Sequence, residues 1–167
     1  PFPDYTWNTG SLPGWEFNAD GDTEGWTTNA ASSAVTNGFF TASAVNADSL
    51  EFVWPEDKVV LSDKTPFVEV DINLLDTATF GQTEMAVGDI QIAFRNDESE
   101  EWHYASIFDY STRPPEEISP SYRQNLYFDM YNHPDWADKT ITDVKLVILP
   151  KEGMRLNVDA KINFFRM

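Results

Sequence analysis

Aromatic and planar polar side chains alternate along several short segments of this sequence, and such side chains suit the binding of sugar rings. A sugar presents apolar C–H faces and a rim of hydroxyl groups, so flat rings and bidentate hydrogen-bonding groups complement it. If three of these segments form a meander of strands, the side chains opposite their core faces line up on one sheet. The candidate ligand-binding residues are Gln91, Arg95, Trp102, Tyr104, Tyr127, Asp129, Tyr131 and, before Pro55, Trp54.

The same aromatic residues have an alternative role in packing, because Trp and Tyr are often partly buried in a second core or at a strand edge. Trp102 follows the very polar run 96–101 and is the aromatic residue most expected to face a ligand. Trp54 could lie in a loop and stack on a ligand, or it could pack at the edge of a sheet. His103 alternates to the side opposite Trp102, which predicts a structural role.

Acidic residues crowd one turn near the start of the sequence. Asp20, Asp22 and Glu24 follow Glu16 at intervals of two to four residues, with Asn18 among them. Side chains of like charge repel one another at such spacing unless water solvates them or a cation binds them. Calcium takes about six to eight oxygen ligands, many of them carboxylates. The spacing does not fit an EF-hand loop, so either a different calcium site or a solvated Asp-Gly turn is expected.

Catalytic residues of the common kinds are scarce, which predicts that the chain is not an enzyme. It has no Cys and only two His, so thiolate nucleophiles and Cys-based metal sites are excluded. No Gly-x-Ser-x-Gly elbow is present. A polysaccharide lyase would combine Tyr with His, Arg and Gln around a uronate. Residues 127–133, with Arg95 and Gln91, offer a faint version of that set, so a small lyase is an alternative.

The net charge of −17, from 28 acidic and 11 basic residues, narrows the range of partners. Such a surface repels phosphate backbones and anionic membrane surfaces, so neither nucleic acid nor a lipid bilayer is an expected partner. A strongly anionic polymer is disfavoured for the same reason unless calcium bridges it. No apolar run approaches the ~20 residues of a membrane-spanning helix, so no membrane insertion is expected.

Hydrophobic residues alternate with polar ones at a period of two, which predicts half-buried β-strands. In the segment 67–74, for example, Val68, Val70, Ile72 and Leu74 share one side. Turn signals separate about nine such segments, and no convincing helix is found beyond a single turn near residue 137. Strands are expected at 67–74, 89–95, 126–130, 141–149 and 156–164, with further candidates at 15–18, 39–45, 50–54 and 102–110.

The length of 167 residues fits one domain. Many short strands at this spacing, without helices, predict an all-β fold, an antiparallel β-sandwich over residues 13–167. Residues 1–12 are interpreted as a linker or N-terminal lead-in. Residues 112–121 form the one long loop that is expected.

Four segments, taken in order, resemble a known family. They are WEFNADGDTEGW at 15–26, NGFFT at 37–41, the stretch 136–150 and VDAKI at 158–162. Together they resemble the jelly-roll, galactose-binding-like carbohydrate-binding modules attached to secreted bacterial enzymes that degrade polysaccharides. The resemblance spans residues 15–167 and departs from the family at Ala160, where these modules often carry Trp. It implies that Trp26 and Trp136 belong to the core.

The resemblance also implies a calcium site and a function. In such modules the first and last strands lie side by side and share a structural Ca²⁺, which here points to Glu16 and Asp159, with Asp20 and Asp22 as lesser candidates. The implied function is non-catalytic binding of a polysaccharide or oligosaccharide by a monomer linked covalently to a catalytic domain. Its implied location is outside the cell or on its surface. A calcium-stabilised spacer or adhesion domain that binds no sugar is the main alternative.

Overall fold

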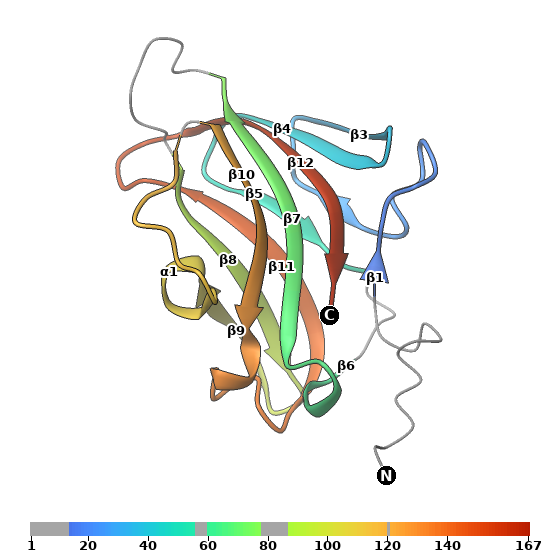
Figure 1. Ribbon diagram of the computed structural model, residues 1–167, viewed down its shortest axis with the longest axis vertical. Coiled ribbons are helices and arrows are strands. Elements are labelled where there is room, and N and C mark those ends of the chain that lie inside the picture. The colour runs from blue at the N-terminus through green and yellow to red at the C-terminus, as the bar shows by residue number, and fades with distance from the viewer. Residues whose placement is uncertain (1–13, 56–59, 78–86, 120) are drawn as a thin grey trace.

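Two antiparallel β-sheets packed face to face form the protein, and this arrangement confirms the predicted β-sandwich. The computed structural model describes residues 14–55, 60–77, 87–119 and 121–167. The predicted lead-in at 1–12 lies outside the described residues. No described helix has the length and apolarity that crossing a membrane would require. In Figure 1 one sheet lies toward the viewer and the other behind it, and they are called the front and back sheets below.

The front sheet is built around the last strand of the chain. Its strand order is β10-β7-β12-β4-β3, and β1 also pairs with β12. This pairing of β1 with β12 confirms the expectation that the closing strand returns beside the opening strand. The front strands are β1 (Gly14–Trp15), β3 (Ser32–Thr36), β4 (Phe39–Ala47), β7 (Phe67–Asp76), β10 (Ser121–Asp129) and β12 (Leu156–Arg166).

The back sheet is built around β11. Its strand order is β2-β5-β11-β8-β9, and the short β6 also pairs with β11. The back strands are β2 (Thr27–Thr28), β5 (Leu50–Val53), β6 (Val60–Leu61), β8 (Val87–Asn96), β9 (Ser99–Ser106) and β11 (Thr140–Pro150). The helical turns are α1 (Ile107–Tyr110), η2 (Ser62–Lys64) and η3 (Met130–Asn132).

The core lies between the sheets and is filled by the residues that the period-two pattern selects. Val68, Val70, Ile72 and Leu74 of β7 are all buried, as are Ile90, Ile92 and Phe94 of β8 and Tyr122, Leu126 and Phe128 of β10. Alternation places successive side chains on opposite faces of a strand, so one half of each strand enters the core and the other half faces outward. The aromatic residues Trp15, Trp26, Trp54, Phe165, Phe17, Phe40 and Phe52 gather at one end of the core.

Two predictions about individual residues are decided by burial. Trp26 and Trp136 lie in the core, as expected, and the Trp136 indole donates to the carbonyl of Thr65 at 3.0 Å. Trp54 is only 2 % exposed and contacts Trp15 at 6.1 Å between ring centroids. The prediction of Trp54 as a ligand platform is therefore wrong, because Trp54 follows β5 and continues its alternation, with Leu50 and Phe52, into the core.

The path of the chain after β9 differs from the predicted meander. Helix α1 ends β9, and the following loop carries the chain to the other sheet, where β10 pairs with β7. The main-chain N–H of Thr112 donates to the carbonyl of Tyr127 at 2.9 Å and fixes this loop against β10. The outward residues of β8 and β9 therefore face away from those of β10, on opposite sides of the sandwich.

Candidate functional site

The outer face of the front sheet is ordered in rows by its strand register. Arg123 of β10, Asn73 of β7 and Lys161 of β12 are successive register partners and form one row. Tyr127, Glu69 and Arg166 form a second row on the same strands. Residues directly opposite each other in antiparallel strands point to the same face, so both rows project outward from the sandwich.

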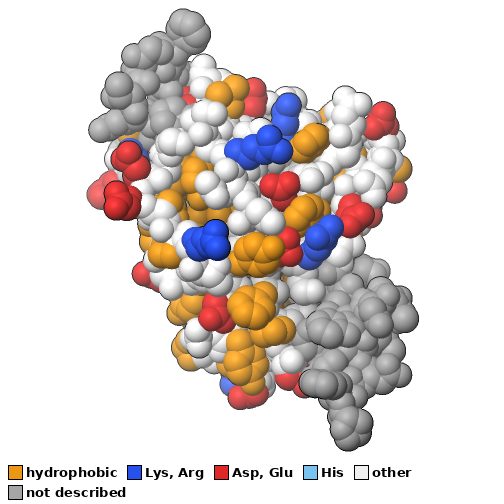
Figure 2. Space-filling model, viewed as in Figure 1, with side chains coloured by type: hydrophobic (Ala, Val, Ile, Leu, Met, Phe, Trp, Pro, Cys, Tyr) orange, Lys and Arg blue, Asp and Glu red, His pale blue; other side chains and the backbone are white. Residues whose placement is uncertain are grey.

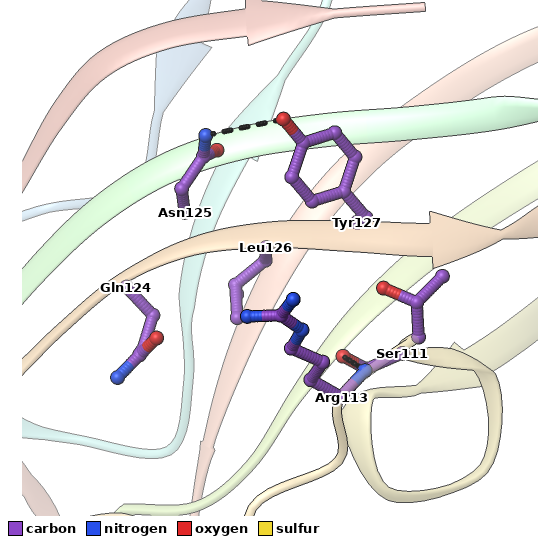
Figure 3. A pocket seen from close by; sticks show the side chains of 7 residues that line it. Ser111, Arg113, Gln124, Asn125, Leu126 and Tyr127 are labelled. Carbon is purple, nitrogen blue, oxygen red and sulfur yellow. Dashed lines mark hydrogen bonds between the residues drawn. The ribbon is translucent and has the colours of Figure 1, made fainter.

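Three pockets lie on this face or at its edge. The pocket at the β10 edge has a volume of about 390 Å³ and lies between β10 and the loop after α1 (Figure 3). In Figure 3, Asn125 and Tyr127 lie on one side of β10, and Gln124 and Arg113 lie on the other. A second pocket of about 510 Å³ shares Thr112 and Tyr127 with the first, so the two adjoin. The third, of about 100 Å³, is lined by Phe39, Asp71, Ile72, Asn73, Arg123, Lys161 and Asn163.

Exposed aromatic rings stand beside these pockets. Tyr127 is 42 % exposed and Phe67 is 46 % exposed, and both line the 510 Å³ pocket. Figure 2 shows hydrophobic side chains gathered along the middle of the front face, with Lys and Arg side chains beside them. Large rings left open to water on a rigid sheet provide flat apolar surfaces for a ligand.

The acidic side chains of the front face are held by neutral partners. The Asn125 amide donates to Glu69 at 3.2 Å, and the Asn163 amide donates to Asp71 at 3.1 Å. In the described structure the side chains of Arg123, Asn73 and Lys161 make neither a hydrogen bond nor an ion pair, although the Lys161 ammonium lies 6.0 Å from the Phe39 ring. The row they form therefore leaves three groups of donors free for a ligand.

Arg166 closes one end of the face. Its guanidinium lies 3.9 Å from the centre of the Phe164 ring and donates to Glu16 at 2.8 Å. This hydrogen bond and charge lower the pKa of Glu16. Arg166 is thus already engaged by residues of its own chain.

The outer face of the back sheet differs, because its polar groups satisfy one another. Gln91 and Ser106 both donate to Asp89, each at 2.8 Å. The cations of Arg95 and Lys145 lie 4.7 and 4.2 Å from the centre of the Trp102 ring. The same cations form ion pairs with Asp143 at 3.0 Å and Glu51 at 3.1 Å. A sugar that stacked on Trp102 would have to displace these cations.

The predicted ligand-binding residues therefore do not form one site. Four of them, Gln91, Arg95, Trp102 and Tyr104, come together on the back face, whereas Tyr127 lies on the front face. Asp129 and Tyr131 lie at the end of β10. The Asp129 carboxylate accepts from the Asn132 amide at 2.6 Å, and the Tyr131 hydroxyl donates to Asp138 at 3.0 Å. The expected single aromatic face is wrong because β10 joins the front sheet.

The predicted convergence of Glu16 and Asp159 is also wrong. Strand β1 meets β12 at Arg166 and Phe165, whereas Asp159 lies near the other end of β12 and accepts from the Ser43 hydroxyl at 2.6 Å. Continued by one residue, this register places Glu16 beside Phe164, five residues or about 17 Å along the strand from Asp159, while calcium–oxygen distances are about 2.4 Å. Within the described residues, no three His, Cys, Asp or Glu side chains are placed to hold a metal ion.

The carboxylates of the acidic turn accept hydrogen bonds from backbone N–H groups. Asp20 accepts from the N–H of Asn37 at 3.0 Å, and Asp22 accepts from that of Glu24 at 2.8 Å. The Glu24 carboxylate accepts from the N–H of Phe17 at 2.6 Å. Of these, the contact of Asp22 with the N–H two residues later is that of an Asx turn, and the other two join segments farther apart in the sequence.

The structure separates the residues of the faint lyase pattern. His133 is buried, stacks on Tyr110 at 4.9 Å and contacts Phe94, so it is remote from solvent. Burial lowers the pKa of His133. Its Nδ1 accepts from the N–H of Asp135 at 3.2 Å, and its Nε2 lies 3.1 Å from the Tyr104 carbonyl, which describes a neutral ring with a structural role. Tyr127 lies on the front face and Arg95 on the back face.

Sequence reasoning missed the front-face residues Phe67, Asn73, Arg123 and Lys161. Phe67, Asn73 and Lys161 occupy outward positions of strands that the sequence predicted, whereas Arg123 precedes the predicted strand 126–130 and lies in the part of β10 that was missed. The grouping of all four depends on β7 pairing with both β10 and β12. A search of the outward positions of all predicted strands would have included the first three among many others.

Comparison with known proteins identifies similar folds. No protein-family model matches this chain, and no curated protein matches its sequence. One similar solved structure is a non-crystalline cellulose specific carbohydrate-binding module, CBM28, with 10 % identity and a TM-score of 0.55 over 89 % of this chain and 90 % of that chain. Another comes from work on the promiscuous specificity of carbohydrate-binding modules from the β-sandwich superfamily. It has 9 % identity and a TM-score of 0.50, and it covers 86 % of this chain and 56 % of that one. The resemblance to carbohydrate-binding modules is thus confirmed for the fold.

Proposed function

We propose that this protein binds a polysaccharide on the outer face of its front sheet and carries out no reaction on it. The main support is the row of free donors, Arg123, Asn73 and Lys161, on the same face as the exposed rings of Tyr127 and Phe67. Rings can cover the C–H faces of sugars, while amide and guanidinium groups bond their hydroxyls or other polar groups. The fold shared with carbohydrate-binding modules supports the same role.

The back face supports this role less well, since its ion pairs would compete with a ligand. The two cations over Trp102, Arg95 and Lys145, are each paired with a carboxylate on a neighbouring strand. Replacing these contacts with a sugar requires breaking them, and an unpaired charge left behind would lower the affinity. The free groups of the front face carry no such penalty.

Attachment to an enzyme is part of the proposal. A binding module joined by a linker raises the effective concentration of its enzyme on the polymer. We propose that the module acts in this way outside the cell, as a monomer linked to a polysaccharide-degrading domain.

Native gel electrophoresis through soluble polysaccharides tests the proposed function. The gels contain hydroxyethylcellulose, xylan, polygalacturonate or dextran sulfate, and a pull-down with amorphous cellulose covers an insoluble polymer. We expect retardation by at least one polymer and no release of sugar or unsaturated product from it. Absence of retention on every polymer would refute the proposal.

A pair of matched variants assigns the binding to the front face. Phe67→Ala removes a ring that is 46 % exposed beside the proposed site, and Phe108→Ala removes one that is 37 % exposed on α1 and lines none of the three front pockets. We expect Phe67→Ala to reduce retardation and Phe108→Ala to leave it unchanged. The reverse result would place the binding surface elsewhere.

A further inference from the structure

Basic residues without an acidic partner gather at the front face. Five basic side chains in the described structure form ion pairs, namely Arg95, Lys139, Lys145, Arg155 and Arg166. Four others whose side chains are described form none: Arg113, Arg123, Lys151 and Lys161. Three of these four line the front pockets, and only Lys151 lies elsewhere. This distribution is unexpected in a chain with 28 acidic residues available as partners.

We infer that the front face recognises a polysaccharide carrying negatively charged groups, carboxylate or sulfate, and that Arg123 and Lys161 bind them. The inference rests on the proposed function and specifies its ligand. Arg123 and Lys161 lie on either side of Asn73 in one row, on strands two apart in the sheet. Their Cα atoms are about 10 Å from each other, so both long side chains can reach one anionic group above Asn73.

The chemistry of this row favours an anion over neutral hydroxyl groups. A guanidinium presents paired N–H donors that match a carboxylate or sulfate, and such charge-assisted bonds are about twice as strong as neutral ones. A neutral sugar that covered the two cations would take them out of water without supplying an opposite charge. The Asn73 amide adds a neutral donor between them.

The nearby acidic residues do not remove this preference. Glu69, Asp71 and Asp159 lie on the same face, and each accepts from a neutral Asn or Ser side chain, not from Arg123 or Lys161. The outward positions of β7, β10 and β12 carry three basic residues, Arg123, Lys161 and Arg166, and four acidic ones, Glu69, Asp71, Asp129 and Asp159, so this face is nearly balanced within a chain of net charge −17. Salt screens the more distant charges over about 8–10 Å, so contacts in the row decide binding at physiological ionic strength. The expectation that acidity disfavours an anionic polymer therefore does not apply to this face.

Charge-neutralising variants on four polymers test the inference. The polymers are polygalacturonate and alginate as carboxylates, dextran sulfate as a sulfate, and hydroxyethylcellulose as a neutral glucan. We expect the wild-type protein to bind at least one anionic polymer more tightly than hydroxyethylcellulose. Arg123→Gln and Lys161→Gln should each weaken that binding about fivefold. Comparison of the carboxylate polymers with dextran sulfate shows which anion the face prefers.

Lys151→Gln is the matched control, because it removes the same charge from the other basic residue without an acidic partner. It should leave binding unchanged, and thermal melts should show all three variants folded, since none of these side chains is buried. Equal weakening by Lys151→Gln would refute the inference by showing general charge attraction. Preferred binding of hydroxyethylcellulose, undiminished in Arg123→Gln and Lys161→Gln, would refute it while leaving the proposed function intact. Binding to no polymer, including xylan and amorphous cellulose, would refute both.

Discussion

Replacing Tyr127 by Ala should weaken polysaccharide binding by an amount that the structure allows us to estimate. The ring is 42 % exposed and borders two adjoining pockets of the front face. Its hydroxyl accepts from the Asn125 amide at 3.4 Å, which helps to orient it. Truncation removes the exposed ring surface without opening a cavity in the core.

The magnitude follows from the area that a ligand would cover. A Tyr side chain has roughly 200 Å² of surface, so an exposure of 42 % leaves about 85 Å² open to a ligand. At about 25 cal/mol per Å², covering half to all of this area contributes about 1–2 kcal/mol. This free energy corresponds to a dissociation constant that rises about 5- to 30-fold in Tyr127→Ala.

Isothermal titration calorimetry on the polymer that binds most tightly measures this change, and Tyr104→Ala is the control. Tyr104 is 50 % exposed on the back face, so its truncation removes a comparable ring from the opposite side of the sandwich. Its dissociation constant should stay within about twofold of the wild type. If Tyr104→Ala loses affinity and Tyr127→Ala keeps it, the assignment to the front face is wrong.

Two further predictions concern pH and metal. Burial lowers the pKa of His133, so its neutral form stabilises the fold. The free energy of unfolding should be at its full value above about pH 6.5 and fall as the pH drops below it, because the unfolded chain binds the proton first. Urea midpoints between pH 5 and pH 7 should show a smaller slope for His133→Gln, and an unchanged slope would contradict this reasoning. The calcium ion predicted from the sequence is tested by melting with and without EDTA. Asp159→Ala should lower stability by about 1 kcal/mol through the lost Ser43 hydrogen bond and leave any effect of EDTA unchanged. Loss of EDTA sensitivity in that variant would restore Asp159 as a ligand.

The alternating strands were predicted well because their signal is local. Val68, Val70, Ile72 and Leu74 are buried as expected, since a strand that lies on a core must turn alternate residues inward whatever strand it pairs with. The short strands were harder to predict. Strand β3 and helix α1 were missed, because β3 buries only Val35 and α1 has only four residues, too few for a periodic pattern.

The grouping of the site could not be predicted from the same pattern. Pairing of Tyr127 with Glu69 joins residues 58 positions apart, and pairing of Asn73 with Lys161 joins residues 88 positions apart. Alternation tells which residues face outward on each strand but not which strands are neighbours. A meander from β8 to β10 was predicted because consecutive strands are neighbours more often than not. The prediction is wrong because the chain crosses to the other sheet after α1.

The sequence by itself determined that this protein is an antiparallel β-sandwich with an aromatic-rich core and polar outward faces. These properties follow from period-two patterning and composition, which act within single strands. Only the tertiary structure decided that Tyr127 stands with Arg123, Asn73 and Lys161 on the front face, that Trp102 is covered by cations on the back face, and that Glu16 is far from Asp159. The physical reason is that strand order and register depend on how the two complete sheets pack against each other around one hydrophobic core.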